Sequence, residues 1–512
     1  MQTTTKYKGP FGFKGGLHTK AGAFTLPQDC MSAAQNVYVY GDKLYKIGGS
    51  ALINSSALNS GAVITGLCDW QTAAQNRYLV IVAGSKAYSD LNLGSSPSDI
   101  TGSATITAGN QHTFASLNNI LAICGGTDTP LQWTGTGNVS SLAGSPTAGS
   151  LVATANNFMF ISGNSSNPSG IWWSNPSDPG TWPAGSSLNF RASDGDIITA
   201  IAPLNYNLII FKRRSTGILY TQTNITSGIA TLGPLTQINV GIGCAGSQAW
   251  DVLPNGMLVV FGIDGHLRLF DGSNFTDISD PPMPYSNIQP TLDACNIGRF
   301  PYACVKAYPM LNQIWLAVST GSNTTNDTIF VFDYVQMAWQ CVIPDRAANI
   351  LCASIDNRSV PHHPIVLLSG DYGGYVYEHD YGSTNAQNSD SHIDGYGTCS
   401  IQMGVESTDF QQTSIRVAQD GQAIGQLQVG YGFNDLTNIN NTQVITSIPA
   451  GAKLDINFLL DSSLLGGSNV LINEITTPST GRIYTSQVQF RNSNASQPFV
   501  VHPFWISEEI IV

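Results

Sequence analysis

The chain has 512 residues and a formal net charge of -12, with 21 Lys and Arg against 33 Asp and Glu. Charged residues make up 11% of it, whereas an ordinary globular protein has about 25%. This shortage excludes a coiled coil and most helical bundles, because helices in water cover their outer faces with residues such as Glu, Lys and Arg. The polar residues are mostly Ser, Thr, Asn, Gln and Gly, which favour turns and strands. We therefore expect an all-β protein with a large core.

The same composition limits the partners. An acidic chain with few basic residues offers little counter-charge to nucleic acid or to an anionic membrane, so DNA could pass it without adhering. No apolar run approaches the roughly 18 to 20 residues of a membrane span, and Met1–Leu17 has no apolar segment typical of a signal peptide. The nine cysteines form no Cys-x-x-Cys pair, which favours buried reduced thiols over disulfides or a zinc ribbon.

The chain begins with a segment predicted to be an arm, residues 1–29. It is interrupted by Gly9-Pro10, Gly12 and Gly15-Gly16, and an arm without its own core needs a partner surface to become ordered. A hairpin is predicted next, at residues 36–46 around Gly41-Asp42. It belongs to no full repeat. A ring of blades needs a strand from one end of the chain to close its last blade, and this hairpin could supply that strand.

An internal repeat organises the next part of the chain. Each copy has a strand, a turn that usually contains Asn, and an apolar strand stopped by Gly, and Asn suits such turns because it tolerates positive φ. The turn marks are Asn76, Asn119, Asn157, Asn207, Gly256 and Gln313. They lie 43, 38, 50, 49 and 57 residues apart, and a looser seventh copy covers residues 353–370.

Periods of about 40 to 50 residues with several strands each are typical of β-propeller blades. Residues 30–381 are therefore predicted to form a β-propeller of seven blades, with six or eight as alternatives. A pair of β-sandwiches or a β-solenoid would also give a strand-rich repeat. Residues 382–394 are polar and predicted to be a linker, and residues 395–512, which keep the strand alternation but lose the repeat, are predicted to form a C-terminal β-sandwich.

Two motifs were considered as sites and assigned to structure. Gly241–Gly246 satisfies G-x-G-x-x-G, but a strand and a turn follow where a dinucleotide site needs a helix, so a turn between blades is expected. Ser177–Trp182 is similar to the Asp-box of sialidase-type propellers, which is itself a structural turn. The few arginines are not distributed one per blade, as the carboxylate-binding cluster of a sialidase would require.

Two groups of metal-ligand residue types were also considered. Asp194 and Asp196 could bind Ca²⁺, but their loop lacks the ladder of oxygen ligands found in calcium motifs, so a solvated turn is expected. His362 and His363 lie between prolines in an extended segment, where neighbouring side chains point apart rather than converge on one metal. The expectation is a protein that is not an enzyme, with no catalytic residues, no cofactor and no metal.

The segment Gly170–Pro183, read with Asn189-Phe190, Ser193–Ile198 and Phe211-Lys212, resembles the β-propeller tail hub or nozzle proteins of short-tailed bacteriophages. Further agreement comes from three other stretches in the same order along the chain. They are Ala34–Val39 with Lys46–Gly48, where the family often has Arg-Pro-Gly, then Val240–Gly246, and Phe261–Gly272. The similarity covers roughly residues 25–380, and the region after residue 395 has no assigned role.

The resemblance implies a structural virion protein of the tail, assembled in the host cytoplasm. Six copies would form a nozzle below the portal and the head-to-tail adaptor, and would extend the channel for DNA ejection without binding the genome specifically. Tail fibre, spike or tail-tip proteins would dock on it, with the N-terminal arm and the C-terminal domain as docking elements. Two alternatives are a surface propeller that binds or cleaves host glycans and a monomeric bacterial protein-interaction propeller.

Overall fold

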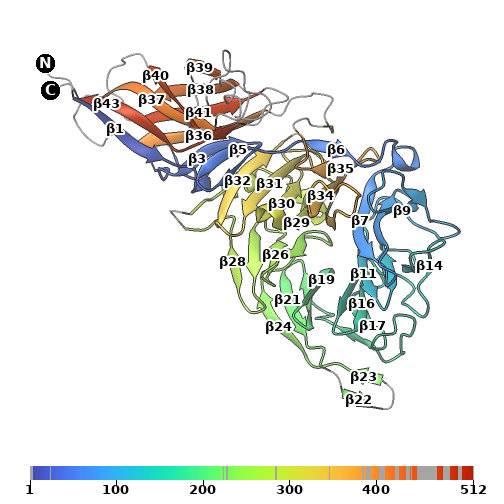
Figure 1. Ribbon diagram of the computed structural model, residues 1–512. Coiled ribbons are helices and arrows are strands. Elements are labelled where there is room, and N and C mark those ends of the chain that lie inside the picture. The colour runs from blue at the N-terminus through green and yellow to red at the C-terminus, as the bar shows by residue number, and fades with distance from the viewer. Residues whose placement is uncertain are drawn as a thin grey trace.

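The computed structural model (Figure 1) is all-β, and its described helices are short segments in the connections between strands. The structure describes residues 4–22, 25–222, 224–226, 229–282, 285–344, 346–382, 386–387, 394–402, 410–420, 426–433, 439, 441–446, 470–476, 485–493 and 499–510. None of the described helices is long and apolar enough to cross a membrane.

Seven four-stranded antiparallel blades make up the larger part of the described chain. Blade 1 comprises β7 Ile64–Gln71, β8 Arg77–Ala83, β9 Lys86–Leu91 and β10 Ser98–Asp99. Blade 2 comprises β11 Thr113–Leu117, β12 Ile120–Cys124, β13 Leu131–Trp133 and β14 Ser140–Ser141. Blade 3 comprises β15 Leu151–Ala155, β16 Phe158–Asn164, β17 Asn167–Trp173 and β18 Ser187–Asn189. Blade 4 comprises β19 Ile198–Leu204, β20 Asn207–Lys212, β21 Ser215–Leu219 and β24 Leu235–Val240, with a two-stranded ribbon of β22 Asn224–Thr226 and β23 Ile229–Thr231 between its last two strands.

Blades 5 to 7 complete the ring (Figure 1). Blade 5 comprises β25 Trp250–Val252, β26 Leu258–Phe261, β27 Leu267–Phe270 and β28 Phe275–Asp277. Blade 6 comprises β29 Cys304–Tyr308, β30 Gln313–Val318, β31 Thr328–Asp333 and β32 Ala338–Ile343. Blade 7 comprises β33 Ile350–Ile355, β34 Ile365–Gly370, β35 Val376–His379 and β6 Ser50–Leu52. The short helices are η1 Leu58–Ser60, α1 Gln289–Asp293, η2 Ile297–Tyr302 and η3 Pro309–Leu311. The predicted propeller and its seven blades are confirmed.

The turns between the first two strands of the blades explain the repeat. Asn119, Asn157 and Gly256 have positive φ, as predicted from the turn marks. In the fourth and sixth copies the strained residues are Asn205 and Asn312, and the predicted Asn207 and Gln313 each begin the following strand. Asn adopts positive φ with less steric strain than other non-glycine residues, so it recurs in the turns between the first two strands of the blades.

The ring is closed by a strand from the N-terminal part of the chain. β6 pairs with β35, with Leu52 opposite Tyr377 and Ser50 opposite His379, and β33 of blade 7 contacts β7 of blade 1. A closing strand from one end of the chain was predicted, but the hairpin at residues 36–46 does not supply it. The propeller begins at Ser50, so the boundary predicted at residue 30 was wrong.

A second domain is built from both ends of the chain. Its N-terminal strands are β1 Thr4–Phe11, β2 Gly16–Leu17, β3 Cys30–Gln35, β4 Val37–Tyr40 and β5 Lys43–Lys46. Its C-terminal strands are β36 Gly395–Gln402, β37 Phe410–Asp420, β38 Gln426–Phe433, β39 Asn441–Thr446, β40 Val470–Thr476, β41 Thr485–Asn492, β42 Val500–Val501 and β43 Phe504–Ile510. One sheet has the order β1-β43-β37-β42-β5-β4 with β40 beside β37, and the other continues blade 6 from β32 through β3, β36, β41 and β38 to β39.

The two sheets pack face to face as a β-sandwich. Phe13 lies between Phe490 of one sheet and Phe504 of the other, with ring centroids 5.8 Å and 6.1 Å away. The C-terminal β-sandwich is thus confirmed, but the arm predicted at residues 1–29 supplies two of its strands, because the surface that orders it belongs to the same chain. The propeller is therefore an insertion within the sandwich. Most of the predicted linker, residues 382–394, lies outside the described residues.

Candidate functional site

A central channel runs between the inner strands of the seven blades. Its volume is about 340 Å³, and residues from all seven inner strands line it. Most of the wall is apolar or carries small polar groups. Three charged side chains interrupt it, Asp69 on β7, Asp251 on β25 and Lys306 on β29.

The charged groups of the channel are arranged in two ion pairs. Lys306 Nζ donates to Asp251 Oδ1 at 3.0 Å, and Asp251 Oδ2 accepts the backbone N–H of Ala307 at 2.9 Å. Arg77 binds Asp69 through Nε, 2.8 Å from Oδ1, and through a terminal nitrogen to Oδ2. Burial lowers the pKa of Lys306, but the charge and hydrogen bond of Asp251, together with the neighbouring Cys352 and Cys304, outweigh burial and the net effect raises the pKa. Lys306 therefore remains an ammonium, and the four side chains sum to zero charge.

Two thiols lie on the same wall. Burial raises the pKa of Cys352 to about 11 and that of Cys68 well above its ordinary value. The thiolate is the nucleophilic form of cysteine. Both groups are therefore protonated at neutral pH, and they do not form an activated nucleophile.

The residues of the channel were not singled out from the sequence. Asp69, Asp251 and Lys306 lie 55 or more residues apart, so only ring closure brings them together. A weak signal existed, since each interrupts an otherwise apolar inner strand, as in Leu67-Cys-Asp69-Trp. The pattern could not reveal that the interruptions share one cavity.

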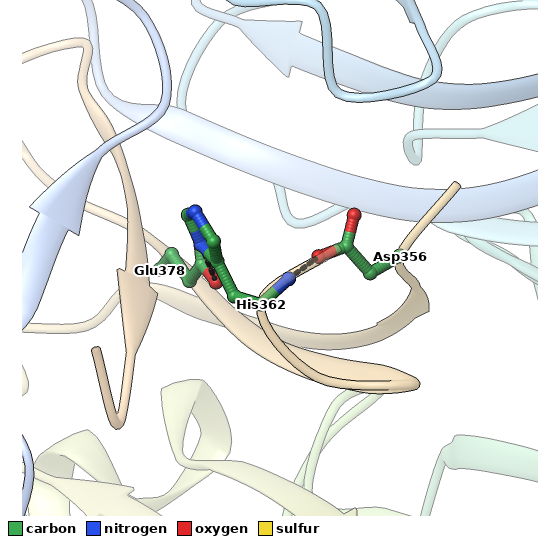
Figure 2. A group of neighbouring side chains, drawn as sticks. All are labelled: Asp356, His362 and Glu378. Carbon is green, nitrogen blue, oxygen red and sulfur yellow. Dashed lines mark hydrogen bonds and ion pairs between the residues drawn. The ribbon is translucent and has the colours of Figure 1, made fainter. Parts of the chain in front are cut away.

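A second cluster lies in blade 7, where Asp356, His362 and Glu378 place potential metal-ligand atoms within 4.8 Å of one another (Figure 2). His362 Nδ1 lies 2.9 Å from Glu378 Oε1. Both carboxylates are also held by Arg358, which makes two bonds of 2.6 and 2.8 Å to Asp356 and two of 2.8 and 3.0 Å to Glu378. A guanidinium between the carboxylates satisfies their charge, so the cluster ties the 356–362 loop to β35 and does not favour a metal.

His363 has a different partner from its neighbour. Its Nε2 lies 3.3 Å from the carbonyl oxygen of Asp380, whereas the ring of His362 stacks on Tyr381 with centroids 3.8 Å apart. The two rings therefore do not converge, as the extended Pro-His-His-Pro segment predicted. The sequence did not identify Asp356 and Glu378, which are separated by a complete β-strand.

The loop that contains Asp194 and Asp196 surrounds a buried lysine. The Nζ atom of Lys212 donates to Asp194 Oδ1 at 2.6 Å, to the carbonyls of Arg191 and Asp196 at 2.9 and 3.1 Å, and to Ser169 Oγ at 3.1 Å. The Lys212 side chain has no exposed surface. The loop is a largely exposed turn, as the sequence predicted, and its oxygens also converge on the chain's own ammonium group.

The glycine motif serves close packing between blades 4 and 5. A Cβ on Gly243 would lie 2.0 Å from the carbonyl oxygen of Lys212, and one on Gly246 would lie 2.0 Å from that of Pro301. The motif connects β24 to β25, and no helix opens there. The expected turn between blades is thus present, and the glycines are required by backbone contacts.

The segment that is similar to an Asp-box is a turn after β17. The Gly180 N–H donates to Asp178 Oδ1 at 3.0 Å, and Trp182 Nε1 donates to the carbonyl of Pro179 at 2.8 Å. The backbone groups of Ser177 join the turn to its neighbours, since its N–H donates to the carbonyl of Asn157 and its carbonyl accepts from Asn118 Nδ2. The segment therefore has the structural role that the sequence indicated.

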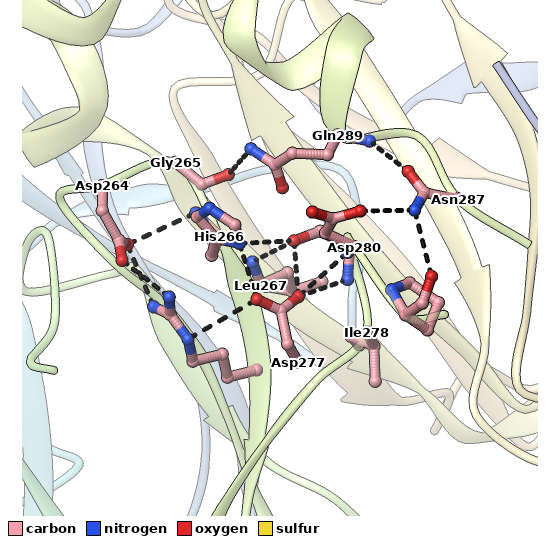
Figure 3. Close-up of polar contacts among 12 residues, drawn as sticks. Asp264, Gly265, His266, Leu267, Asp277, Ile278, Asp280, Asn287 and Gln289 are labelled. Atoms are coloured by element: carbon pink, nitrogen blue, oxygen red, sulfur yellow. Dashed lines mark hydrogen bonds and ion pairs between the residues drawn. The ribbon is translucent and has the colours of Figure 1, made fainter. Parts of the chain in front are cut away.

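In blade 5, His266 lies beside Asp277 (Figure 3), and Ser279 is close to both. His266 Nδ1 lies 2.6 Å from Asp277 Oδ2 and 3.5 Å from Ser279 Oγ, so both partners contact the same ring nitrogen. A catalytic triad places the acid and the serine on opposite nitrogens. Ser279 Oγ instead donates to Asp277 Oδ1 at 2.8 Å and accepts from the backbone N–H of Leu267 at 3.2 Å, which fixes the turn after β28.

The same network anchors the N-terminal segment. Asp280 accepts from Asn287 Nδ2 at 2.6 Å and from Lys20 Nζ at 2.5 Å, and the backbone N–H of Thr19 donates to the carbonyl of Asn287 at 2.8 Å. Residues that begin the chain are thus fixed to the loop after blade 5. These contacts hold the segment in place, just as the contacts in Figures 2 and 3 hold loops of the propeller to its strands.

Comparison with known proteins gives matches among solved structures. No protein-family model and no curated protein matches this chain. Among solved structures, similarity was found to the computationally designed Ika8 protein, with a TM-score of 0.39, 14% identity, and coverage of 63% of this chain and 98% of that one. BBS1N in complex with ARL6DN has a TM-score of 0.40 and 10% identity, and the match covers 67% of this chain and 98% of that one. BamB from Moraxella catarrhalis has a TM-score of 0.37 and 10% identity, and the match covers 67% of this chain and 96% of that one. With all three TM-scores this low, the fold assignment rests on the sheet topology.

Proposed function

We propose that this protein is a structural component of a short-tailed bacteriophage tail, where copies of the chain form a hexameric nozzle below the portal and the adaptor. The nozzle extends the channel through which DNA leaves and docks other tail parts. The observation that carries the proposal is the ordered set of sequence stretches that resemble tail nozzle proteins. No catalytic role is assigned to any residue.

Some of these stretches contact one another around Lys212. Ser193–Ile198 surrounds the ammonium of Lys212, whose own carbonyl packs against Gly243 in the Val240–Gly246 stretch. Ser169, next to the stretch that begins at Gly170, also accepts from Lys212. Segments spread over some 75 residues therefore meet at the junction of blades 3, 4 and 5. A shared motif of this kind preserves blade geometry, which suits a load-bearing wall.

The central channel of the propeller limits where DNA could pass. The cavity of about 340 Å³ has the volume of a small-molecule site, about 300 to 1,000 Å³, which is far smaller than the space that a DNA duplex needs. Lys306 and Asp251 further narrow it with an ion pair. A DNA conduit would therefore lie between copies of the chain and not through a propeller. This requirement favours a ring of copies over a monomer.

The test is electron microscopy of the purified chain, alone and mixed with the adaptor ring of the same phage. Light scattering measures the mass of the particles first. We expect six-fold particles, formed alone or on the adaptor, with a central hole wide enough for a duplex. A chain that lacks residues 1–15, and so lacks β1, serves as a variant with an altered sandwich domain and an intact propeller.

Two results would contradict the proposal. If the protein remains monomeric with the adaptor present, it does not form a ring. If it forms a ring whose hole is too narrow for a duplex, it is not a DNA conduit. Association of the variant with the adaptor as tightly as the full chain would specifically exclude β1 as a docking element. Activity on host glycans by a stable monomer would favour the alternative of a surface propeller.

A further inference from the structure

Blade 4 has an outer strand that differs from those of the other blades. β24 is six residues long and pairs with β21 on one side, whereas β10, β14, β18, β28 and β6 have two or three residues each. The outer strand of blade 6, β32, is also six residues long, but β3 pairs with its outer side. Among the described residues, β24 is thus the one long outer blade strand with no strand beside its outer edge.

The edge of β24 lacks most of the features that prevent edge-to-edge association. An exposed edge presents unpaired N–H and C=O groups that can add a further strand, and natural edges are guarded by charges, Pro or bulges. β24 has a bulge at Ile238 but contains no charged residue and no Pro. No Asp, Glu, Lys or Arg occurs between Arg214 and Asp251. Val240, at the end of the strand, is 71% exposed.

The sandwich domain has a similar open edge in β39. This strand has six residues, ends the ten-stranded sheet and pairs with β38 alone among the described strands. It contains no charged residue and no Pro, and the chain is uncharged between Asp435 and Lys453. Val444 is 52% exposed. β39 therefore combines the length and the lack of charge that distinguish β24.

Other edges of the sandwich are protected. β1 contains two lysines and a proline, and β40 contains Glu474. On β4, the backbone N–H of Val39 donates to Gln340 Oε1, and the Val39 carbonyl accepts from Gln336 Nε2. Charges, Pro and bonded backbone groups of this kind oppose the addition of a strand. The two uncharged edges, β24 and β39, are thus the better candidates for an interface.

Charge and position favour a second copy of this chain as the partner of both edges. Each copy carries a formal charge of -12, so two copies repel one another unless charge-poor surfaces meet. Figure 1 places β39 in the sandwich and β24 at the opposite end of the molecule, so one copy cannot pair its own two edges. Contact between different surfaces of successive copies is head to tail, and it closes into a ring when the rotation permits.

We propose that β24 of one copy pairs with β39 of the next copy and that this strand addition builds the hexameric ring. The same kind of junction exists within one chain, where β32 of blade 6 pairs with β3 of the sandwich. The two edges match in length, with six residues each. The inference rests on the ring of the proposed function and names the two surfaces that form it.

The test places one lysine on each edge. Lys guards an edge strand because strand addition would hold its charge at the contact. Val240→Lys and Val444→Lys should each raise the dissociation constant of the ring at least about tenfold. Sedimentation velocity measures this for the full chain, alone and with the adaptor ring. Val360→Lys is the matched control, because Val360 is 75% exposed and lies between β33 and β34, away from both edges. It should leave the ring unchanged.

A mixture of the two edge variants tests whether the contact joins different surfaces. The intact β39 of Val240→Lys can bind the intact β24 of Val444→Lys, while the second contact stays blocked. The mixture should therefore form dimers and no rings. Thr236→Lys, also at an exposed position of β24, replaces Val240→Lys if thermal melts show that the latter does not fold.

Three results would overturn the proposal. Rings that persist in both edge variants would exclude these edges and leave the proposed tail function intact. Loss of association in Val240→Lys but not in Val444→Lys would exclude β39 and indicate that β24 pairs with another strand, such as β24 of a second copy. A wild-type chain that stays monomeric with the adaptor would contradict this inference and the proposed function together.

Discussion

The ammonium of Lys212 provides the sharpest test of how the propeller is held together. The side chain has no exposed surface, and its four oxygen acceptors come from β17 and from the loop that links blade 3 to blade 4. Lys212→Met keeps most of the volume and removes the charge. Breaking a buried ion pair costs about 3 to 5 kcal/mol. We expect about 3 kcal/mol, because Asp194 is 17% exposed and retains Arg191 as a partner.

The assay is urea unfolding followed by tryptophan fluorescence, with hydrogen exchange to locate the change. Arg213→Met is the matched control, because Arg213 is the next residue and is exposed. We expect the control to change the free energy of unfolding by less than about 0.5 kcal/mol. The loss for Lys212→Met should be accompanied by faster exchange in residues 191–198.

The effect should also depend on pH. Burial raises the pKa of Asp194, but the hydrogen bond and charge of Lys212, together with hydrogen bonds from the Asp196 N–H and Arg191, outweigh burial and hold the pKa below its ordinary value. A depressed carboxyl pKa stabilises the fold above the unfolded value, about 3.9, and the contribution is lost as pH falls through the folded value. The difference between wild type and Lys212→Met should therefore shrink below about pH 4. A variant within about 0.5 kcal/mol of the wild type at pH 7 would refute the reasoning.

Two further predictions concern packing and the N-terminal segment. Gly246→Ala should destabilise the propeller by about 1 to 3 kcal/mol, because its Cβ would lie 2.0 Å from the Pro301 carbonyl oxygen, whereas Gly185→Ala, with open space around its Cβ, should be neutral in thermal melts. Asp280→Asn should speed tryptic cleavage after Lys20 up to about fivefold, since a partly exposed pair contributes at most about 1 kcal/mol. An unchanged melt for the first variant, or an unchanged cleavage rate for the second, would contradict them.

Much of the architecture follows from local patterns. The Asn-containing turns and alternating strands predicted a propeller of seven blades, because each blade is a meander whose strands are neighbours in sequence. The turn nature of Ser177–Trp182 and of Gly241–Gly246 was also predicted. These features depend on contacts within or between consecutive blades, which a sequence pattern records directly.

The candidate site was not predicted as a site. Trp250, Asp69 and Lys306 come from blades 5, 1 and 6, and only the closed ring makes them line one channel. The cation environment of Lys212 was missed for a related reason. A loop rich in oxygen acceptors can bind a metal ion from solution or the ammonium group of a lysine in the next strand, and its sequence does not distinguish the two.

The sequence by itself determined the all-β composition and the repeat, since these depend on residue type and local spacing. The tertiary structure alone decided which strands close the ring and how the ends of the chain meet. β6 reaches blade 7 across more than 320 residues, and β1 pairs with β43 across the whole chain. Such pairings depend on main-chain hydrogen bonds that many strands could make, so no residue pattern marks the partner before the propeller brings the two ends together.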